Sequence, residues 1–155
     1  MLDKYEKRAL LITGGIIMLF IFSLLYAMVK EKIQVTDCLP YNKVYTESKV
    51  TRLDERSYQV FAVARMWNFE PAQIYIPVGS EVDFFLTSKD VVHGFNISDK
   101  NVNLMAVFGG ISKTTVRFDQ PGVYKNTCHE YCGVGHENMQ AEVIVNYPER
   151  SYSKD

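Results

Sequence analysis

The sequence predicts an all-β sandwich domain that follows a single membrane-spanning α-helix. Three observations predict this fold class. Residues 9–29 form one uncharged apolar run, and residues 58–147 contain short segments rich in β-branched and aromatic residues, separated by Pro, Gly, Asp and Asn. No amphipathic helical pattern interrupts those short segments. This strand spacing is typical of an antiparallel β-sandwich.

The helix is predicted from the run Ala9–Val29, which carries no charge. A helix of this length reaches about 31 Å, the thickness of a hydrocarbon core. A cleaved signal peptide is the alternative, but its apolar part is usually about 7–15 residues long and ends at a small-residue cleavage site. We therefore expect residues 1–32 to be a retained anchor. Lys and Arg flank both ends in similar numbers, so they do not fix its orientation.

The rest of the chain divides into a linker, the sandwich and a tail. Residues 33–57 are polar, lack a clear period and contain Pro40, so they are expected to form a linker. The sandwich is expected over residues 58–147, and the charged residues 148–155 are expected to be loose. The strands are expected at residues 59–64, 73–76, 81–87, 91–97, 113–118, 123–126 and 141–145.

The composition limits the classes of function. The chain has 155 residues, 17 Lys and Arg against 18 Asp and Glu, and a net charge of -1, so no excess positive charge would attract nucleic acid. Only 3 Cys and 3 His are present, and all the histidines and two of the cysteines lie between residues 93 and 136. An odd cysteine count with this clustering disfavours a disulfide scaffold and favours a metal or nucleophile site.

The side chains with ligand chemistry gather in one loop before the last expected strand. The loop contains Cys128, His129, Cys132, His136 and Met139. Thiolate and thioether ligands combined with imidazole favour copper over hard cations. Glycines at 133 and 135 would let the backbone fold tightly enough for the ligands to converge.

An upstream histidine completes a ligand set. His93 lies at the end of an expected strand that a sandwich can place beside this loop. With one cysteine, such a set would hold a mononuclear blue-copper centre. The second cysteine changes the count, because two thiolates can each bridge two copper ions and leave one histidine as a terminal ligand for each. The expected ligands are therefore His93, Cys128, Glu130 through its backbone carbonyl, Cys132, His136 and Met139.

Other interpretations of the same residues remain open. Two cysteines with two histidines match a tetrahedral zinc site, and Cys128 and Cys132 would form a local disulfide in an oxidising compartment. Met139 and the order of the residues favour copper over zinc, and both over a disulfide. His129 and Cys38 match no ligand position. We expect His129 to lie beside the ligands or at the surface, and Cys38 to be a free or inert thiol.

A family resemblance rests on the spacing of these residues. The pattern is Cys128-x-Glu130-x-Cys132-Gly-x-x-His136-x-x-Met139, preceded by Val-x-His93-Gly-Phe. It resembles the dinuclear CuA site of subunit II of haem–copper cytochrome c oxidases. The resemblance implies an all-β cupredoxin-like sandwich with Greek-key connections, preceded by a single N-terminal transmembrane α-helix. One helix and a short chain look more like the B-family oxidases of bacteria and archaea, which places the copper domain on the periplasmic or outer side of a prokaryotic cell membrane.

The resemblance also implies a function in electron transfer. Two copper ions would accept electrons from a c-type cytochrome and pass them to haem in the large subunit I, where oxygen is reduced to water. The chain itself is expected to hold no oxygen-reducing site, since it has one membrane helix and no spare histidines for haem. The CuA subunit of a related nitric oxide reductase is the alternative.

Two further residues take roles from the resemblance. An exposed aromatic residue of this family receives electrons from cytochrome c, and Trp67, the single tryptophan, stands at the corresponding place. In many relatives the carboxylate at the position of Glu130 binds magnesium at the boundary with subunit I, whereas B-family members often lack that metal. Magnesium at Glu130 is therefore a secondary expectation beside the copper pair.

Overall fold

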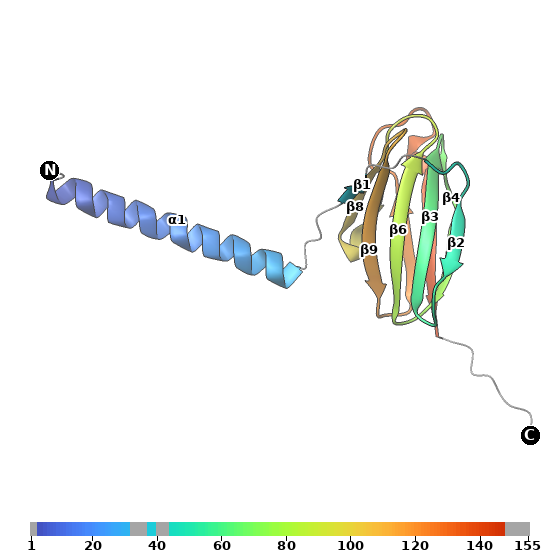
Figure 1. The fold of residues 1–155 in the computed structure, drawn as a ribbon. Helices are drawn as coiled ribbons and strands as arrows, with labels where there is room; N and C mark the ends of the chain where they lie inside the picture. Colours follow the sequence, from blue (N-terminus) through green and yellow to red (C-terminus); the bar gives the residue numbers. More distant parts are fainter. Residues whose placement is uncertain (1–2, 32–36, 40–43, 148–155) are drawn as a thin grey trace, which may run out of the picture. The chain divides into compact units, whose positions relative to one another are not determined.

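The computed structural model describes residues 3–31, 37–39 and 44–147 (Figure 1). The chain divides into two compact units, residues 1–35 and residues 36–155. The tail at 148–155, which the sequence predicts to be loose, lies outside the described residues.

In its described residues, the first unit contains one helix, α1 (Lys4–Glu31). Asp3 caps its start, because the Asp3 carboxylate accepts hydrogen bonds from the amides of Tyr5 and Glu6 at 2.6 and 2.8 Å and so satisfies donors that have no partner in an earlier turn. The segment Lys4–Lys30 has a mean hydropathy of 2.4 within its most apolar window, and none of that window is buried. The predicted helix over 9–29 is confirmed, and its length and composition suffice to cross a membrane.

The second unit is a sandwich of two β-sheets (Figure 1). The first sheet has the order β1-β9-β6-β3-β2, with β4 paired to β3, and the second has the order β5-β11-β10-β7-β8. The first sheet consists of β1 (Asp37–Leu39), β2 (Lys49–Arg52), β3 (Ser57–Arg65), β4 (Asn68–Glu70), β6 (Ser80–Ser88) and β9 (Ile111–Phe118). The second sheet consists of β5 (Gln73–Pro77), β7 (His93–Ile97), β8 (Val102–Ala106), β10 (Gly122–Thr127) and β11 (Gln140–Asn146). Two 3-10 turns, η1 (Ser98–Lys100) and η2 (His136–Asn138), lie in the loops.

The core lies between the sheets and follows the alternation of the sequence. Val82, Phe84 and Leu86 of β6 are fully buried, because alternate residues of a strand point to the same face. The Phe84 ring lies 5.6 Å from the ring of Phe95 on β7, a contact that joins the two sheets. Burial of each such side chain stabilises the fold by about 1.5–3 kcal/mol, so this alternation confirms the predicted sandwich.

All seven predicted strands are present, but the expectation of a purely antiparallel sandwich is wrong for two pairs. Strands β3 and β6 are parallel, and so are β5 and β11. The chain leaves β3 through β4 and then β5 of the opposite sheet before β6 returns beside β3. A return through the other sheet brings the chain back in the same direction, which a hairpin cannot do.

Part of the segment that the sequence assigns to a linker, residues 33–57, belongs to the sandwich. Strand β1 pairs with β9, and β2 pairs with β3. The Tyr45 hydroxyl lies 2.9 Å from the carbonyl oxygen of Ala62 on β3 and 2.6 Å from that of Phe85 on β6, and burial raises the pKa of this hydroxyl. This tyrosine therefore fastens the chain before β2 across the parallel pair.

Candidate metal centre

The predicted ligands meet at one end of the sandwich. His93 begins β7, Cys128 follows the last residue of β10, and Met139 precedes the first residue of β11. Since β10 is antiparallel to both β7 and β11, the start of β7 and the loop between β10 and β11 lie at the same end. The Cys128 amide donates a hydrogen bond to the Met139 carbonyl at 3.1 Å and closes the loop at its base.

Within this loop, the sulfurs of Cys132 and Cys128 lie close to each other and to three other possible donor atoms. The Cys132 sulfur lies 3.8 Å from the Cys128 sulfur, 3.6 Å from Nδ1 of His136 and 3.7 Å from the Met139 sulfur. The Cys128 sulfur lies 3.2 Å from the Glu130 carbonyl oxygen. Because a disulfide needs about 2.05 Å between the sulfurs, Cys128 and Cys132 are free thiols, and the structure does not contain the local disulfide that the sequence left open.

His93 adds a nitrogen from the neighbouring strand. Its side chain is fully buried, and a ring nitrogen and the two thiol sulfurs lie within 4.8 Å of one another. Nε2 lies 2.7 Å from Oδ1 of Asp90, whereas Nδ1 is buried without a hydrogen-bond partner among the described residues. A buried nitrogen without a partner destabilises a fold. A soft metal ion beside two thiols would satisfy Nδ1, so the residues present fit copper.

The indole of Trp67 covers the loop. Trp67 lies in the turn between β3 and β4, and its Nε1 donates a hydrogen bond to the Cys132 carbonyl at 3.2 Å. A Cβ atom added to Gly133 would lie 3.0 Å from Nε1 of Trp67, and one added to Gly135 would lie 2.7 Å from Cδ2 of the same ring. Gly133 also has a φ of +119°, which favours glycine. The tight backbone that the sequence predicts is one reason for glycine at both positions. The close approach of the Trp67 indole is a second reason, since it leaves no room for a side chain at position 133 or 135.

Two pKa shifts describe the electrostatics of the site. Burial raises the pKa of the Cys132 thiol to about 11, and the neighbouring Cys128 and Asp90 act in the same direction. Burial also opposes ionisation of Asp90, but hydrogen bonds from His93 and from the amides of Met66 and Val91 outweigh it and hold the pKa of Asp90 below its usual range. In the metal-free chain at neutral pH, the Asp90 carboxylate is therefore ionised and the Cys132 thiol is protonated.

Metal binding is expected to tighten as the pH rises from about 6 to about 8, because a metal ion must displace the Cys132 proton. The pKa of about 11 keeps this thiol protonated over that range, so apparent affinity should rise about tenfold per pH unit for each proton displaced. Competition with a chromophoric copper chelator at several pH values measures this slope. An affinity independent of pH would contradict the assignment of Cys132 as a ligand.

Three further side chains with possible ligand or thiol chemistry are those of His129, Glu130 and Cys38. His129 is exposed, and its ring packs over Gly94, where any Cβ atom would collide with it. The Glu130 carboxylate is half-exposed, with Nε2 of His129 at 4.0 Å, so magnesium at Glu130 stays a prediction. The backbone of Cys38 pairs with Ser112, while its side chain lies outside the described residues.

Asp90 is the residue of the site that the sequence prediction missed. Its position three residues before His93, in a polar turn, was the available signal.

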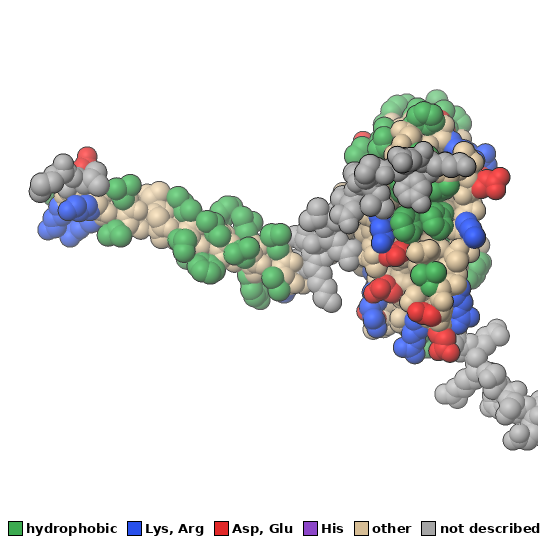
Figure 2. All heavy atoms as spheres, viewed as in Figure 1, with side chains coloured by type: hydrophobic (Ala, Val, Ile, Leu, Met, Phe, Trp, Pro, Cys, Tyr) green, Lys and Arg blue, Asp and Glu red, His purple; other side chains and the backbone are tan. Residues whose placement is uncertain are grey.

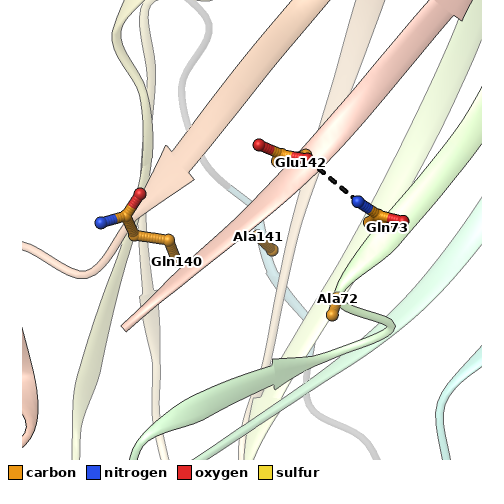
Figure 3. A pocket seen from close by; sticks show the side chains of 5 residues that line it. All are labelled: Ala72, Gln73, Gln140, Ala141 and Glu142. Atoms are coloured by element: carbon orange, nitrogen blue, oxygen red, sulfur yellow. Dashed lines mark hydrogen bonds between the residues drawn. The ribbon is translucent and has the colours of Figure 1, made fainter. Parts of the chain in front are cut away.

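A separate pocket lies between β5 and β11, and it is lined by Ala72, Gln73, Gln140, Ala141 and Glu142 (Figure 3). Gln73 donates a hydrogen bond to Glu142 there at 3.1 Å. This pocket has no thiol or imidazole in its lining, so the ligand cluster is a different place in the fold.

Comparison with known proteins gives consistent matches. Residues 41–146 match the family model described as cytochrome c oxidase subunit II, periplasmic domain. A protein named cytochrome c oxidase subunit 2 from Thermus thermophilus is 35% identical over 96 residues, which cover 62% of this chain and 71% of that protein. A second protein of that name, from a particular strain of the same species, is also 35% identical, and the match spans 57% of its length.

Solved structures show the same likeness. A chain of a heme-copper terminal oxidase dimer, determined by cryo-electron microscopy, is 39% identical with a TM-score of 0.79, and the match covers 92% of this chain and all of that one. The periplasmic domain of subunit II of cytochrome oxidase from Bradyrhizobium japonicum has a TM-score of 0.54 at 19% identity, over 57% of this chain and 83% of that one. At that identity the second match shows the fold alone.

Proposed function

This chain belongs to the cytochrome c oxidase subunit II family of haem–copper oxidases, and from this premise we propose that it is the electron-accepting subunit of such an oxidase, with a dinuclear CuA centre. The observation that carries the proposal is that Nδ1 of the buried His93 has no hydrogen-bond partner among the described residues, while a nitrogen of the same ring lies within 4.8 Å of two free thiols. Soft sulfur donors with imidazole are the ligands that copper prefers.

The proposed copper ligands come from one loop and one strand. The two thiolates would bridge the ions, one histidine would bind each ion, and a thioether and a carbonyl would complete the two coordination spheres. These ligands are Cys128, Cys132, His93, His136, Met139 and the carbonyl of Glu130. When bound, the copper pair supplies a centre that gains and loses one electron.

The chain's own contribution is to hold these donors in place. The Cys128 amide closes the loop on Met139, and Trp67 holds the Cys132 carbonyl. The His136 amide donates to the Gly133 carbonyl at 3.1 Å and tightens the turn that carries the histidine. Donors held in fixed positions need to move little when the oxidation state changes, which favours fast transfer.

Trp67 is the proposed contact for the electron donor. The residue is 43% exposed, and its indole donates a hydrogen bond to the carbonyl of a proposed ligand. Hydrophobic side chains gather at the upper end of the sandwich (Figure 2), and the exposed residues near the ligand loop include Met66, Val91, Val92, Tyr131 and Val134. We propose that a c-type cytochrome docks near Trp67 and that electrons leave toward haem in the large subunit I.

The proposed location follows from the helix and the family. The apolar surface of α1 (Figure 2) would contact membrane lipid as a retained single-pass anchor. The sandwich matches a periplasmic domain family, so it is proposed to face the periplasmic or outer side of a prokaryotic cell membrane. In this arrangement the ligand loop would meet a donor from outside the membrane.

Metal analysis of the full chain in detergent tests the proposal. After reconstitution with copper, we expect two copper ions per chain and a purple protein with a mixed-valence spectrum. A content of one zinc ion per chain, or of one copper ion with a blue-copper spectrum, would contradict the dinuclear assignment. Co-purification with the large subunit, followed by oxygen and nitric oxide consumption assays, decides between the oxidase and the nitric oxide reductase alternative.

A further inference from the structure

We infer that the turn Met66–Trp67 and the metal ligands form one coupled unit, in which Asp90 positions His93 and the Trp67 indole positions the segment 132–135. Asp90 and Trp67 are positioning residues here, because both act through proposed ligands. The inference rests on the proposed function only for the identity of the metal, since every contact behind it is present in the metal-free chain.

Asp90 is the centre of a small hydrogen-bond network. Its Oδ1 lies 2.7 Å from Nε2 of His93 and accepts a hydrogen bond from the Val91 amide at 2.7 Å. Its Oδ2 accepts one from the Met66 amide, also at 2.7 Å. The Ser88 hydroxyl lies 3.3 Å from Oδ1. One carboxylate therefore ties together the end of β6, the start of β7 and the turn between β3 and β4.

This network sets which nitrogen of His93 carries the hydrogen. An ionised carboxylate can only accept hydrogen bonds, so Nε2, which faces Asp90, carries the hydrogen. In the neutral ring, Nδ1 then presents its lone pair, and this is the buried atom without a partner among the described residues. Asp90 thereby leaves the lone pair of His93 Nδ1 free to bind a metal ion, already in the metal-free chain.

The next residue of the same turn reaches the other ligands. While the Met66 amide binds Asp90, the Trp67 indole donates to the Cys132 carbonyl and lies against Gly133 and Gly135. The turn is fixed at its base, because β3 and β4 pair and Arg65 forms an ion pair with Glu70. Consecutive residues of one turn thus support both a histidine and a cysteine of the ligand set.

Coupling of this kind is reciprocal. A metal ion that fixes Cys132 and His93 should also fix the turn, and loss of either contact from the turn should weaken metal binding. Loss of such supporting hydrogen bonds typically lowers metal affinity about 10- to 100-fold. The residue proposed to receive electrons and the ligands of the centre would then keep a constant separation.

Asp90→Asn is the sharpest test. Asparagine keeps one acceptor oxygen, so it cannot accept from both the Met66 amide and Nε2 of His93. In nitrogen-15 NMR spectra of the metal-free full chain in detergent micelles, we expect the wild type to show the Nε2–H tautomer of His93. The variant should show either a changed tautomer or faster hydrogen exchange at the Met66 amide, and copper affinity about 10- to 100-fold lower. An unchanged tautomer together with unchanged exchange would overturn the inference.

Two tryptophan variants keep the test sharp if Asp90→Asn does not fold. Trp67→Phe removes the N–H donor and keeps a ring, whereas Trp67→Ala removes both, so copper release to a chelator should be faster in the first and fastest in the second. Val123→Ala, at a 55% exposed position near the start of β10 and so at the end of that strand away from the ligand loop, is the matched control and should release copper at the wild-type rate. Equal rates in all four chains would overturn the coupling. If the wild type binds no copper, the proposed function fails, while the tautomer and exchange measurements still decide this inference.

Discussion

If the proposed copper pair is present, replacement of Cys132 by serine is expected to abolish it, lowering copper from the proposed two ions per chain to at most one and removing the mixed-valence spectrum. The Cys132 sulfur lies within 3.8 Å of the Cys128 sulfur, Nδ1 of His136 and the Met139 sulfur, so it is close to three other donors. A serine hydroxyl is a hard donor that stays protonated at neutral pH and cannot bridge two copper ions. Copper analysis and visible spectroscopy of the full chain measure the loss.

Cys38→Ser is the matched control for this substitution. Cys38 lies on β1 and matches no position of the ligand pattern, so this variant should keep both copper ions and the wild-type spectrum. The metal-free Cys132→Ser chain should lose only about 1 kcal/mol of stability, which separates the loss of metal from unfolding. A mixed-valence spectrum that survives in Cys132→Ser would show that Cys132 does not bridge the ions.

Gly135→Ala is expected to destabilise the metal-free chain by about 1–3 kcal/mol, through overpacking against the Trp67 indole. The new Cβ atom would lie 2.7 Å from Cδ2 of Trp67. The backbone of Gly135 has a φ of -96°, which alanine adopts without strain, so the expected loss is steric. Chemical denaturation of the metal-free chain measures the free energy of unfolding, and copper release should also accelerate because the ring supports the loop.

A double-mutant cycle isolates the steric cause. In the Trp67→Ala background, Gly135→Ala should cost little, because the ring that it meets is gone. Gly94→Ala is a useful comparison, since its Cβ atom would meet the ring of the exposed His129, which can rotate into solvent at little cost. A loss from Gly135→Ala that persists without Trp67 would contradict this explanation.

Sequence patterns identified the elements whose signals are local. The apolar run over residues 9–29 predicted α1 because its length alone matches a bilayer, and alternation in residues 81–87 predicted β6 because every second side chain is buried. Strand β2 was missed because it is largely exposed at the edge of a sheet and carries little alternation. Strand β8 does alternate, with Val102 and Leu104 buried, so a local signal for this strand is present in the sequence.

Parallel pairing was beyond a sequence pattern for a physical reason. The direction of β6 beside β3 depends on the passage of the chain through the opposite sheet. Each strand has the same alternation whether its neighbour is parallel or antiparallel, so the pattern cannot distinguish the two. Packing of the two sheets decides this direction.

Local patterns predict the N-terminal helix and the strands of the sandwich. They also predict the candidate ligands of one loop, because residues 128–139 are close along the chain. The groups that support those ligands come from distant segments. Asp90 binds the amide of Met66 across 24 positions of sequence, and Trp67 binds the Cys132 carbonyl across 65. Contacts over such separations depend on how two sheets pack, and no local pattern of residues encodes them.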